Sequence, residues 1–128
     1  MRLNQVTLAV TDLARAVSFY RQLGLEQVVA DEHYARFVCP QGDSTLSLQS
    51  VVTMTVSATV VYFECDDLDE RVADLERAGV EFEHGPVDQP WLWREAALRD
   101  PDGNRLCLFY AGKNRLDPPW RLSRERAP

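Results

Sequence analysis

The residues best suited to chemistry lie on two short stretches near the C-terminal end of the chain. Trp93 and Glu95 are two positions apart, as are Cys107 and Phe109. In a β-strand such pairs share one face, so each pair would project from the same side of a sheet. A carboxylic acid enclosed by aromatic rings is desolvated and its pKa rises, as general acid–base catalysis requires. Glu95 is therefore the catalytic candidate, although a glutamate at the edge of a site would simply bind an arginine or water.

Other alternating stretches supply polar and aromatic groups of the same kind. Gln5 and Thr7 share one face of the first predicted strand, and Tyr62 and Glu64 share one face of a later strand. Glu64 is open to the same two interpretations as Glu95. Aromatic walls with a few polar groups are typical of small-molecule sites, so these side chains are predicted to line one.

Three further groups have a structural interpretation beside a chemical one. Cys107 would need a neighbouring base to act as a nucleophile, and the sequence places no histidine beside it, which favours an inert buried thiol. Arg36 and Arg94 are suited to pair with a ligand carboxylate, although solvated strand arginines are commoner.

An internal repeat organises these positions. A shift of 55 residues places Asp12 on Asp67 and Gly24 on Gly79, with matching leucine and valine positions between them. In each copy, hydrophobic and polar residues first alternate as in a β-strand. An aspartate that can cap a helix follows, then an apolar stripe at helical spacing, and finally a glycine that ends the helix. Three more extended stretches follow each predicted helix, so each copy is predicted to be βαβββ.

The predicted elements have the following bounds. In the first copy we expect a strand over 5–10, a helix over 13–23 and strands over 26–30, 34–39 and 45–49. In the second copy we expect a strand over 60–65, a helix over 68–78 and strands over 81–83, 93–99 and 105–110, with His84 in a loop.

Composition limits the class of protein. The 128 residues suffice for one domain, with 45% hydrophobic and 27% charged residues. A net charge of −6 disfavours nucleic-acid and anionic-membrane partners, which need clustered Lys and Arg. No apolar run approaches the roughly 20 residues of a membrane helix and no export signal is visible, so we expect a cytoplasmic protein. Residues 1–112 are expected to form the domain, and residues 113–128 an extended basic tail.

Two segments carry a family resemblance. Residues 5–13 (QVTLAVTDL) run on into 19–25 (FYRQLGL), and residues 100–104 read DPDGN. Around a tandem repeat, this pattern resembles the vicinal oxygen chelate superfamily, also called the glyoxalase/bleomycin resistance/dioxygenase fold. The resemblance spans about residues 3–111. It implies an α+β fold of two tandem βαβββ modules, about 3–50 and 57–111, whose sheets form a cleft.

In the family, that cleft commonly holds a divalent metal between four side chains. Carried over one at a time, the four ligand positions fall on Gln5, Ser47, Val60 and Cys107. Valine offers no donor, and an amide, a hydroxyl and one thiol are a poor set for a divalent cation. We therefore expect no metal and no other cofactor. A divalent metal stays the alternative, because Cys107 supplies one soft ligand.

Three functions are compatible with the sequence. The first is a metal-free site for a small, partly aromatic or apolar molecule, with indole walls and an acidic surface suited to a planar cation. Its predicted lining is Gln5, Thr7, Ser47, Tyr62, Glu64, Trp93, Glu95, Cys107 and Phe109. The second is a metal-independent isomerase or lyase that uses Glu95 as acid and base. The third, a metal-dependent glyoxalase-like lyase or dioxygenase, is disfavoured by Val60. The expected partner is a small-molecule ligand or substrate, and the resemblance is compatible with a homodimer.

Overall fold

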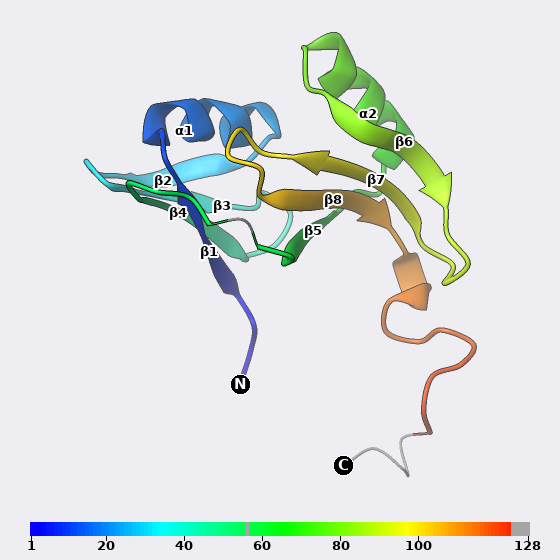
Figure 1. Cartoon of the computed structure of the whole chain (residues 1–128). Coiled ribbons are helices and arrows are strands. Elements are labelled where there is room, and N and C mark those ends of the chain that lie inside the picture. Colours follow the sequence, from blue (N-terminus) through cyan, green and yellow to red (C-terminus); the bar gives the residue numbers. More distant parts are fainter. Residues whose placement is uncertain (56, 124–128) are drawn as a thin grey trace. The chain divides into compact units, whose positions relative to one another are not determined.

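The first module pairs its opening strand with its last one, which gives a mixed four-stranded sheet (Figure 1). In the computed structural model, which describes residues 1–55 and 57–123, its elements are β1 (Gln5–Val10), α1 (Leu13–Gln22), β2 (Glu26–Ala30), β3 (Tyr34–Val38) and β4 (Thr45–Ser50). The strand order is β1-β4-β3-β2, with β1 parallel to β4 and the other neighbours antiparallel. Helix α1 packs on β3 and β4.

The second module repeats this arrangement. Its elements are β5 (Val60–Glu64), α2 (Leu68–Arg77), β6 (Phe82–Asp88), β7 (Arg94–Arg99) and β8 (Arg105–Tyr110), followed by a short 3-10 helix, η1 (Gly112–Asn114). The strand order is β5-β8-β7-β6, and α2 packs against β6. The predicted tandem βαβββ architecture is therefore confirmed, and both sheets place their first and last strands side by side.

The helix ends follow from particular residues. The Asp12 carboxylate accepts a hydrogen bond from the Arg15 backbone N–H at 3.0 Å and caps α1. Asp67 occupies the same position before α2, but its side chain makes no capping hydrogen bond and instead lies 3.8 Å from the Arg71 guanidinium. Gly24 and Gly79 follow the helices with φ of 104° and 98°, the left-handed conformation that ends a helix at little cost for glycine.

Each module buries the apolar face of its sheet and the apolar stripe of its helix. The buried apolar side chains of the first module include Leu8, Val10, Tyr20, Phe37, Leu46 and Leu48, and those of the second include Leu68, Val72, Leu98, Leu106 and Leu108. Burial of one such side chain contributes about 1.5–3 kcal/mol. Tyr110, two positions after Leu108, is 44% exposed at the last position of β8.

One strand is longer than predicted. β6 continues through His84, Gly85 and Pro86, so the expectation that His84 lies in a loop is wrong. The pairing of β6 with β7 shifts register on both sides of His84. β6 is an edge strand, where a proline does not remove a needed hydrogen bond and bulges accommodate the irregular residues.

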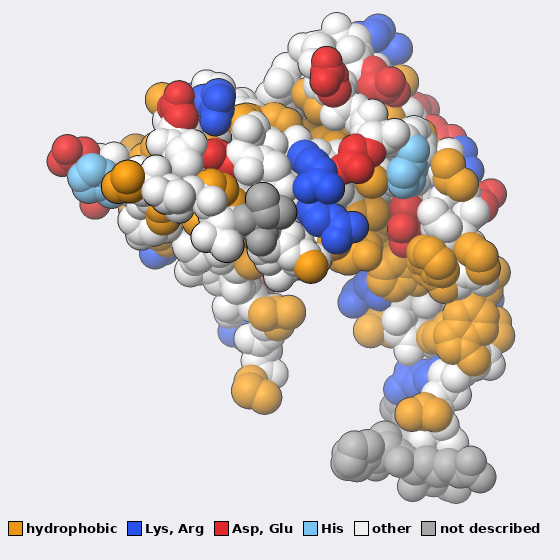
Figure 2. All heavy atoms as spheres, viewed as in Figure 1, with side chains coloured by type: hydrophobic (Ala, Val, Ile, Leu, Met, Phe, Trp, Pro, Cys, Tyr) orange, Lys and Arg blue, Asp and Glu red, His pale blue; other side chains and the backbone are white. Residues whose placement is uncertain are grey.

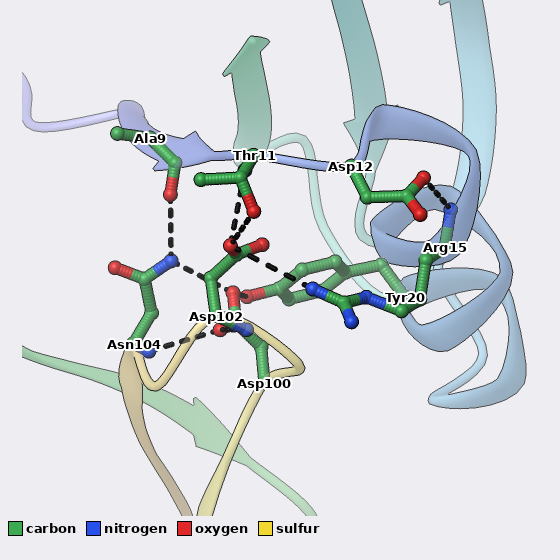
Figure 3. Close-up of polar contacts among 8 residues, drawn as sticks. All are labelled: Ala9, Thr11, Asp12, Arg15, Tyr20, Asp100, Asp102 and Asn104. Atoms are coloured by element: carbon green, nitrogen blue, oxygen red, sulfur yellow. Dashed lines mark hydrogen bonds and ion pairs between the residues drawn. The ribbon is translucent and has the colours of Figure 1, made fainter. Parts of the chain in front are cut away.

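The turn before β8 belongs to the first compact unit, although its residues lie far along the chain. Among the described residues, those of 1–59 and 99–105 form that unit, and those of 60–98 and 106–123 form the other. Figure 3 shows the reason: the buried Asp100 carboxylate accepts the Tyr20 hydroxyl at 2.7 Å and the Asn104 side-chain N–H at 2.8 Å. Asn104 also donates to the Ala9 carbonyl at 2.9 Å, and Asp102 accepts the Thr11 backbone N–H at 3.0 Å. This network fixes β1 and α1 to the turn.

The segment after η1 presents apolar side chains to solvent. Leu116, Trp120 and Leu122 are 66%, 57% and 74% exposed, and Arg121 donates to the Leu116 carbonyl at 3.0 Å. Residues 124–128 of the predicted basic tail, 113–128, lie outside the described residues. Within the described part of the chain, no helix has the length and apolar character to cross a membrane.

Candidate functional site

Three aromatic rings contact one another on the second module. Tyr62 comes from β5, Phe109 from β8, and Trp93 immediately precedes β7. Trp93 and Phe109 are stacked, with ring centroids 4.6 Å apart and planes 20° apart. Tyr62 meets both rings edge-on at 5.9 Å and 5.6 Å. These distances and angles are the favourable aromatic geometries, so the three rings form one ordered surface, the aromatic cluster.

The aromatic cluster rests on a small buried core. Cys107, Phe109 and Ala111 are each 4% exposed, and Val60 and Trp93 pack against them. Cys107 and Phe109 alternate with Leu106 and Leu108 along β8 and therefore lie on the opposite face of the strand, and Ala111 follows directly after it. The structure therefore brings together four residues that sequence alternation placed on one face: Tyr62, Trp93, Cys107 and Phe109.

Glu95 lies beside this core with its carboxylate engaged. The residue is 9% exposed, and its Oε2 accepts the Trp91 indole N–H at 2.7 Å. Burial, and secondly the charge of Glu95, raise the pKa of the Cys107 thiol to about 12. A thiol with such a pKa is protonated at neutral pH and is a weak nucleophile, which supports the inert interpretation of Cys107.

A strained loop presents the two indoles. Between β6 and β7, the Gln89 N–H bonds to the Trp93 carbonyl at 2.8 Å and the Leu92 N–H to the Gln89 carbonyl at 3.0 Å. Leu92 has φ of 68°, which a leucine adopts only at a cost of about 1–3 kcal/mol. The turn directs Trp91 to Glu95 and Trp93 to Phe109. The Trp93 indole N–H also reaches the Asn114 carbonyl at 3.3 Å.

Part of the site surface is apolar and open. Trp91, Leu92 and Tyr62 are 45%, 47% and 48% exposed. Figure 2 shows hydrophobic side chains gathered over the β6–β7 loop and the segment that follows β8. Exposed aromatic area next to a buried carboxylate is more typical of a ligand site than of an inert surface.

Glu64 holds the end of β8 instead of facing a ligand. Its Oε2 accepts the backbone N–H groups of Ala111 at 2.9 Å and Gly112 at 3.0 Å. Its Oε1 lies 3.6 Å from the Arg115 guanidinium. Two backbone donors and an arginine occupy this carboxylate, so of the two candidate acids Glu95 has fewer partners.

The remaining predicted site residues lie on the first module. Gln5 and Thr7 are exposed on β1, and the Gln5 amide oxygen accepts the Thr45 hydroxyl at 2.8 Å. Ser47 is fully buried on β4, beside Thr7 in the strand register, and shares a hydrogen bond of 2.6 Å with the Tyr34 hydroxyl. The cleft that the family resemblance implies stays a prediction.

The family's four metal-ligand positions do not fit a divalent cation. Val60 packs into the apolar core beside Cys107 and offers no donor atom, which leaves the Cys107 thiol as the one soft ligand of the set. Gln5 offers one amide oxygen and Ser47 one hydroxyl already bonded to Tyr34. Over residues 1–55 and 57–123, no group of three or more His, Cys, Asp or Glu side chains is placed to hold a metal ion.

A shallow groove lies away from all of these residues. It has a volume of about 610 Å³ and runs along β2 from Arg21 to Ala30. None of the predicted site residues lines it, and its lining comes from Arg21 of α1, the turn that follows this helix and the edge strand β2. We therefore place the candidate site at the aromatic cluster and Glu95, because these residues combine aromatic rings with a carboxylic acid.

Two features of the site escaped sequence analysis. The Trp91–Glu95 hydrogen bond depends on the left-handed Leu92, which no local pattern signals. The Tyr34–Ser47 contact depends on the pairing of β3 with β4, which alternation alone does not give.

Comparisons with known proteins agree with this architecture. The model of the Glyoxalase/Bleomycin resistance protein/Dioxygenase superfamily matches residues 2–108. A superfamily member from Sphaerobacter thermophilus DSM 20745 is 25% identical with a TM-score of 0.72, over 86% of this chain and 97% of that one. A bleomycin-binding protein complexed with bleomycin is also 25% identical, with a TM-score of 0.72 over 86% and 98%.

A lactoylglutathione lyase from Agrobacterium tumefaciens is 23% identical with a TM-score of 0.75, over 91% of this chain and 96% of that one. That likeness shows the fold alone. A search of curated proteins found no match.

Proposed function

Since the chain belongs to the Glyoxalase/Bleomycin resistance protein/Dioxygenase superfamily, we propose that it binds a small, planar, positively charged molecule without a metal ion. The aromatic cluster of the second module binds the planar part, and Glu95 attracts the charge. The stacked Trp93–Phe109 pair beside a buried carboxylate is the single observation that supports this proposal most.

The aromatic cluster suits stacking with a planar ligand because one of its rings is buried and fixed in place while another is accessible to solvent. Phe109 is buried and fixes the plane of Trp93, whereas Tyr62 is 48% exposed. An aromatic pair contributes about 0.5–1.5 kcal/mol beyond area burial, and a cation over a ring adds about 0.5–2 kcal/mol. A planar cation draws on both contributions, while a neutral ring of the same size draws only on the first.

Charge favours a cation over an anion at this site. Trp91 satisfies one acceptor position of Glu95, and a carboxylate has about four such positions, so acceptor capacity is left for a ligand N–H. The chain as a whole carries −6, which raises the local concentration of cations. A relative with bound bleomycin supports capture of a small molecule on this fold.

The proposal extends to the partners of the chain. We infer a small-molecule ligand, no nucleic-acid or membrane partner, a cytoplasmic location and a homodimeric state. The acidic net charge supports the second point, because nucleic acids and anionic membranes bind clustered Lys and Arg. Light scattering and cell fractionation test the last two.

Isothermal titration with 9-aminoacridine, a planar cation, and acridone, a neutral molecule of similar size, tests the proposal. The protein should prefer the cation, and Trp93→Ala should weaken its binding about tenfold, the loss of about 1.4 kcal/mol of stacking. Trp120→Ala is the matched control, since this indole is 57% exposed and outside the aromatic cluster. Equal losses in the two variants, or no preference for the cation, would contradict the proposal.

A metal-independent isomerase or lyase is the second candidate. It is favoured by the low exposure of Glu95 and by the indole N–H that orients its carboxylate, as an acid–base group requires. Glu95→Gln separates the two: loss of turnover with unchanged ligand affinity identifies an enzyme, whereas reduced affinity for the cation alone identifies a binding protein.

A further inference from the structure

A second polar cluster lies on the first module, on the strand face that carries Ser47. β3 and β4 pair antiparallel with Arg36 directly opposite Ser47, and Tyr34 is two positions from Arg36 on the same face. We propose that Tyr34, Arg36 and Ser47 form a binding site for a small carboxylate, with Tyr34 and Arg36 touching the anion. Ser47 acts as a positioning residue through Tyr34.

The hydrogen bonds orient the phenol as a donor. Arg36 Nε donates to the Tyr34 oxygen at 3.0 Å, and the Ser47 hydroxyl lies 2.6 Å from the same oxygen. When Ser47 donates as well, both acceptor positions of the phenol oxygen are filled and its own hydrogen points away from the protein partners. Two incoming hydrogen bonds polarise the phenol, which makes its O–H a stronger donor to an anionic oxygen.

Arg36 keeps free donors for the same ligand. Its guanidinium carbon lies 5.4 Å from the Tyr34 ring centroid, and Nε is its only hydrogen-bonding atom with a partner among the described residues. The two terminal amino groups of the Arg36 guanidinium therefore lie side by side and available. This is the geometry that binds a carboxylate through two parallel hydrogen bonds.

The neighbours of Arg36 supply no counter-charge. In the strand register Val29 lies beside it on β2 and Ser47 on β4, while Gln49 lies beside Tyr34. Arg94 on β7 shows the contrast: Asp69 accepts from its Nε and Nη2 at 2.9 Å and 3.2 Å, and Asp88 accepts from Nη1 at 3.0 Å. Arg94 is already paired with carboxylates, whereas no carboxylate of the described residues pairs with Arg36.

The titration of Tyr34 agrees with this geometry. The hydrogen bond from Ser47 lowers the pKa of Tyr34, burial opposes the shift, and Arg36 lowers it further by hydrogen bond and charge. The inference does not rest on the proposed function, because it concerns another module and a ligand of opposite charge.

Propionate, which has no ring for the aromatic cluster, is the probe, and neutral propionamide is its control. Two signals report binding: the Arg36 Nε–H resonance in NMR spectra, and the ultraviolet absorbance of the Tyr34 phenolate. We expect the Arg36 resonance to shift saturably with propionate and not with propionamide. We also expect propionate to raise the pKa of Tyr34, because an anion that accepts the phenolic hydrogen disfavours phenolate.

Three variants distinguish a site from a structural contact. Tyr34→Phe should weaken propionate binding about tenfold, as expected for one hydrogen bond to a charged group, and Arg36→Gln should abolish it. Ser47→Ala should raise the pKa of Tyr34 and weaken binding less. Arg94→Gln removes the same charge from another strand and should change nothing. Binding that survives Arg36→Gln, or an Arg36 shift that matches the one caused by chloride, would overturn the proposal.

Discussion

The Tyr20→Phe substitution tests the network that fixes the 100–104 turn to the first module. It keeps the ring, which is fully buried, and removes only the hydroxyl that donates to Asp100 at 2.7 Å. Asp100 retains the Asn104 side chain on the same oxygen, and two backbone N–H groups on the other. One of four hydrogen bonds to a buried carboxylate is lost without a large cavity.

A hydrogen bond to a charged group contributes about 1.5–3 kcal/mol, so Tyr20→Phe should lower the free energy of unfolding by about 2 kcal/mol. For a chain of this length the melting temperature should fall by about 6–10 °C. Urea denaturation followed by circular dichroism measures the first value and calorimetry the second. Tyr110→Phe, whose ring is 44% exposed, is the control and should stay within about 0.5 kcal/mol of wild type. A Tyr20→Phe protein as stable as the control would refute this account of the turn.

Three further predictions concern titration and local order. Burial, and then Asp100, raise the pKa of Tyr20 above 10.0, so above that pH the unfolded chain loses a proton that the folded chain keeps. Stability should therefore fall with rising pH in this range, less steeply in Tyr20→Phe; equal slopes in urea titrations from pH 9 to 11 would contradict this. Glu95→Gln removes the charge that helps to raise the pKa of Cys107, so alkylation of this thiol should begin at lower pH, as mass spectrometry of a variant without the other two cysteines would show. An unchanged alkylation profile would mean that burial alone sets that pKa. Glu64→Ala removes the acceptor of the Gly112 N–H at 3.0 Å, so hydrogen exchange at that amide should accelerate about tenfold or more; unchanged protection would show that the carboxylate does not hold the end of β8.

The fold was predictable because the helix-capping residues, the helix-ending glycines and the strand alternation all indicate the same elements. Asp12 caps the first helix and Gly24 ends it, and the same pattern recurs around Gly79. Strand alternation then indicated which side chains share a face of each sheet. β6 was the exception: Gly85 and Pro86 are turn residues by composition, and only their position on an edge strand lets them extend it.

The candidate site was less predictable, because its contacts cross between strands. Alternation placed Cys107 and Phe109 on one face, and the structure brings them together with Trp93. Glu64 alternates in the same way as Tyr62, yet its carboxylate turns to the backbone after β8. A strand pattern specifies the face of a side chain but not the groups that the next strand and loop bring to it.

Binding of 9-aminoacridine after metal removal tests the central claim most directly, that this family member binds its ligand through aromatic rings and a carboxylate without a metal ion. The protein is dialysed against EDTA and titrated calorimetrically, with and without added Ni²⁺, Zn²⁺ or Mn²⁺. The account predicts one dissociation constant in all four conditions, weakened by Trp93→Ala. Binding that appears only when a metal is restored, and that is lost in Cys107→Ala, would contradict it.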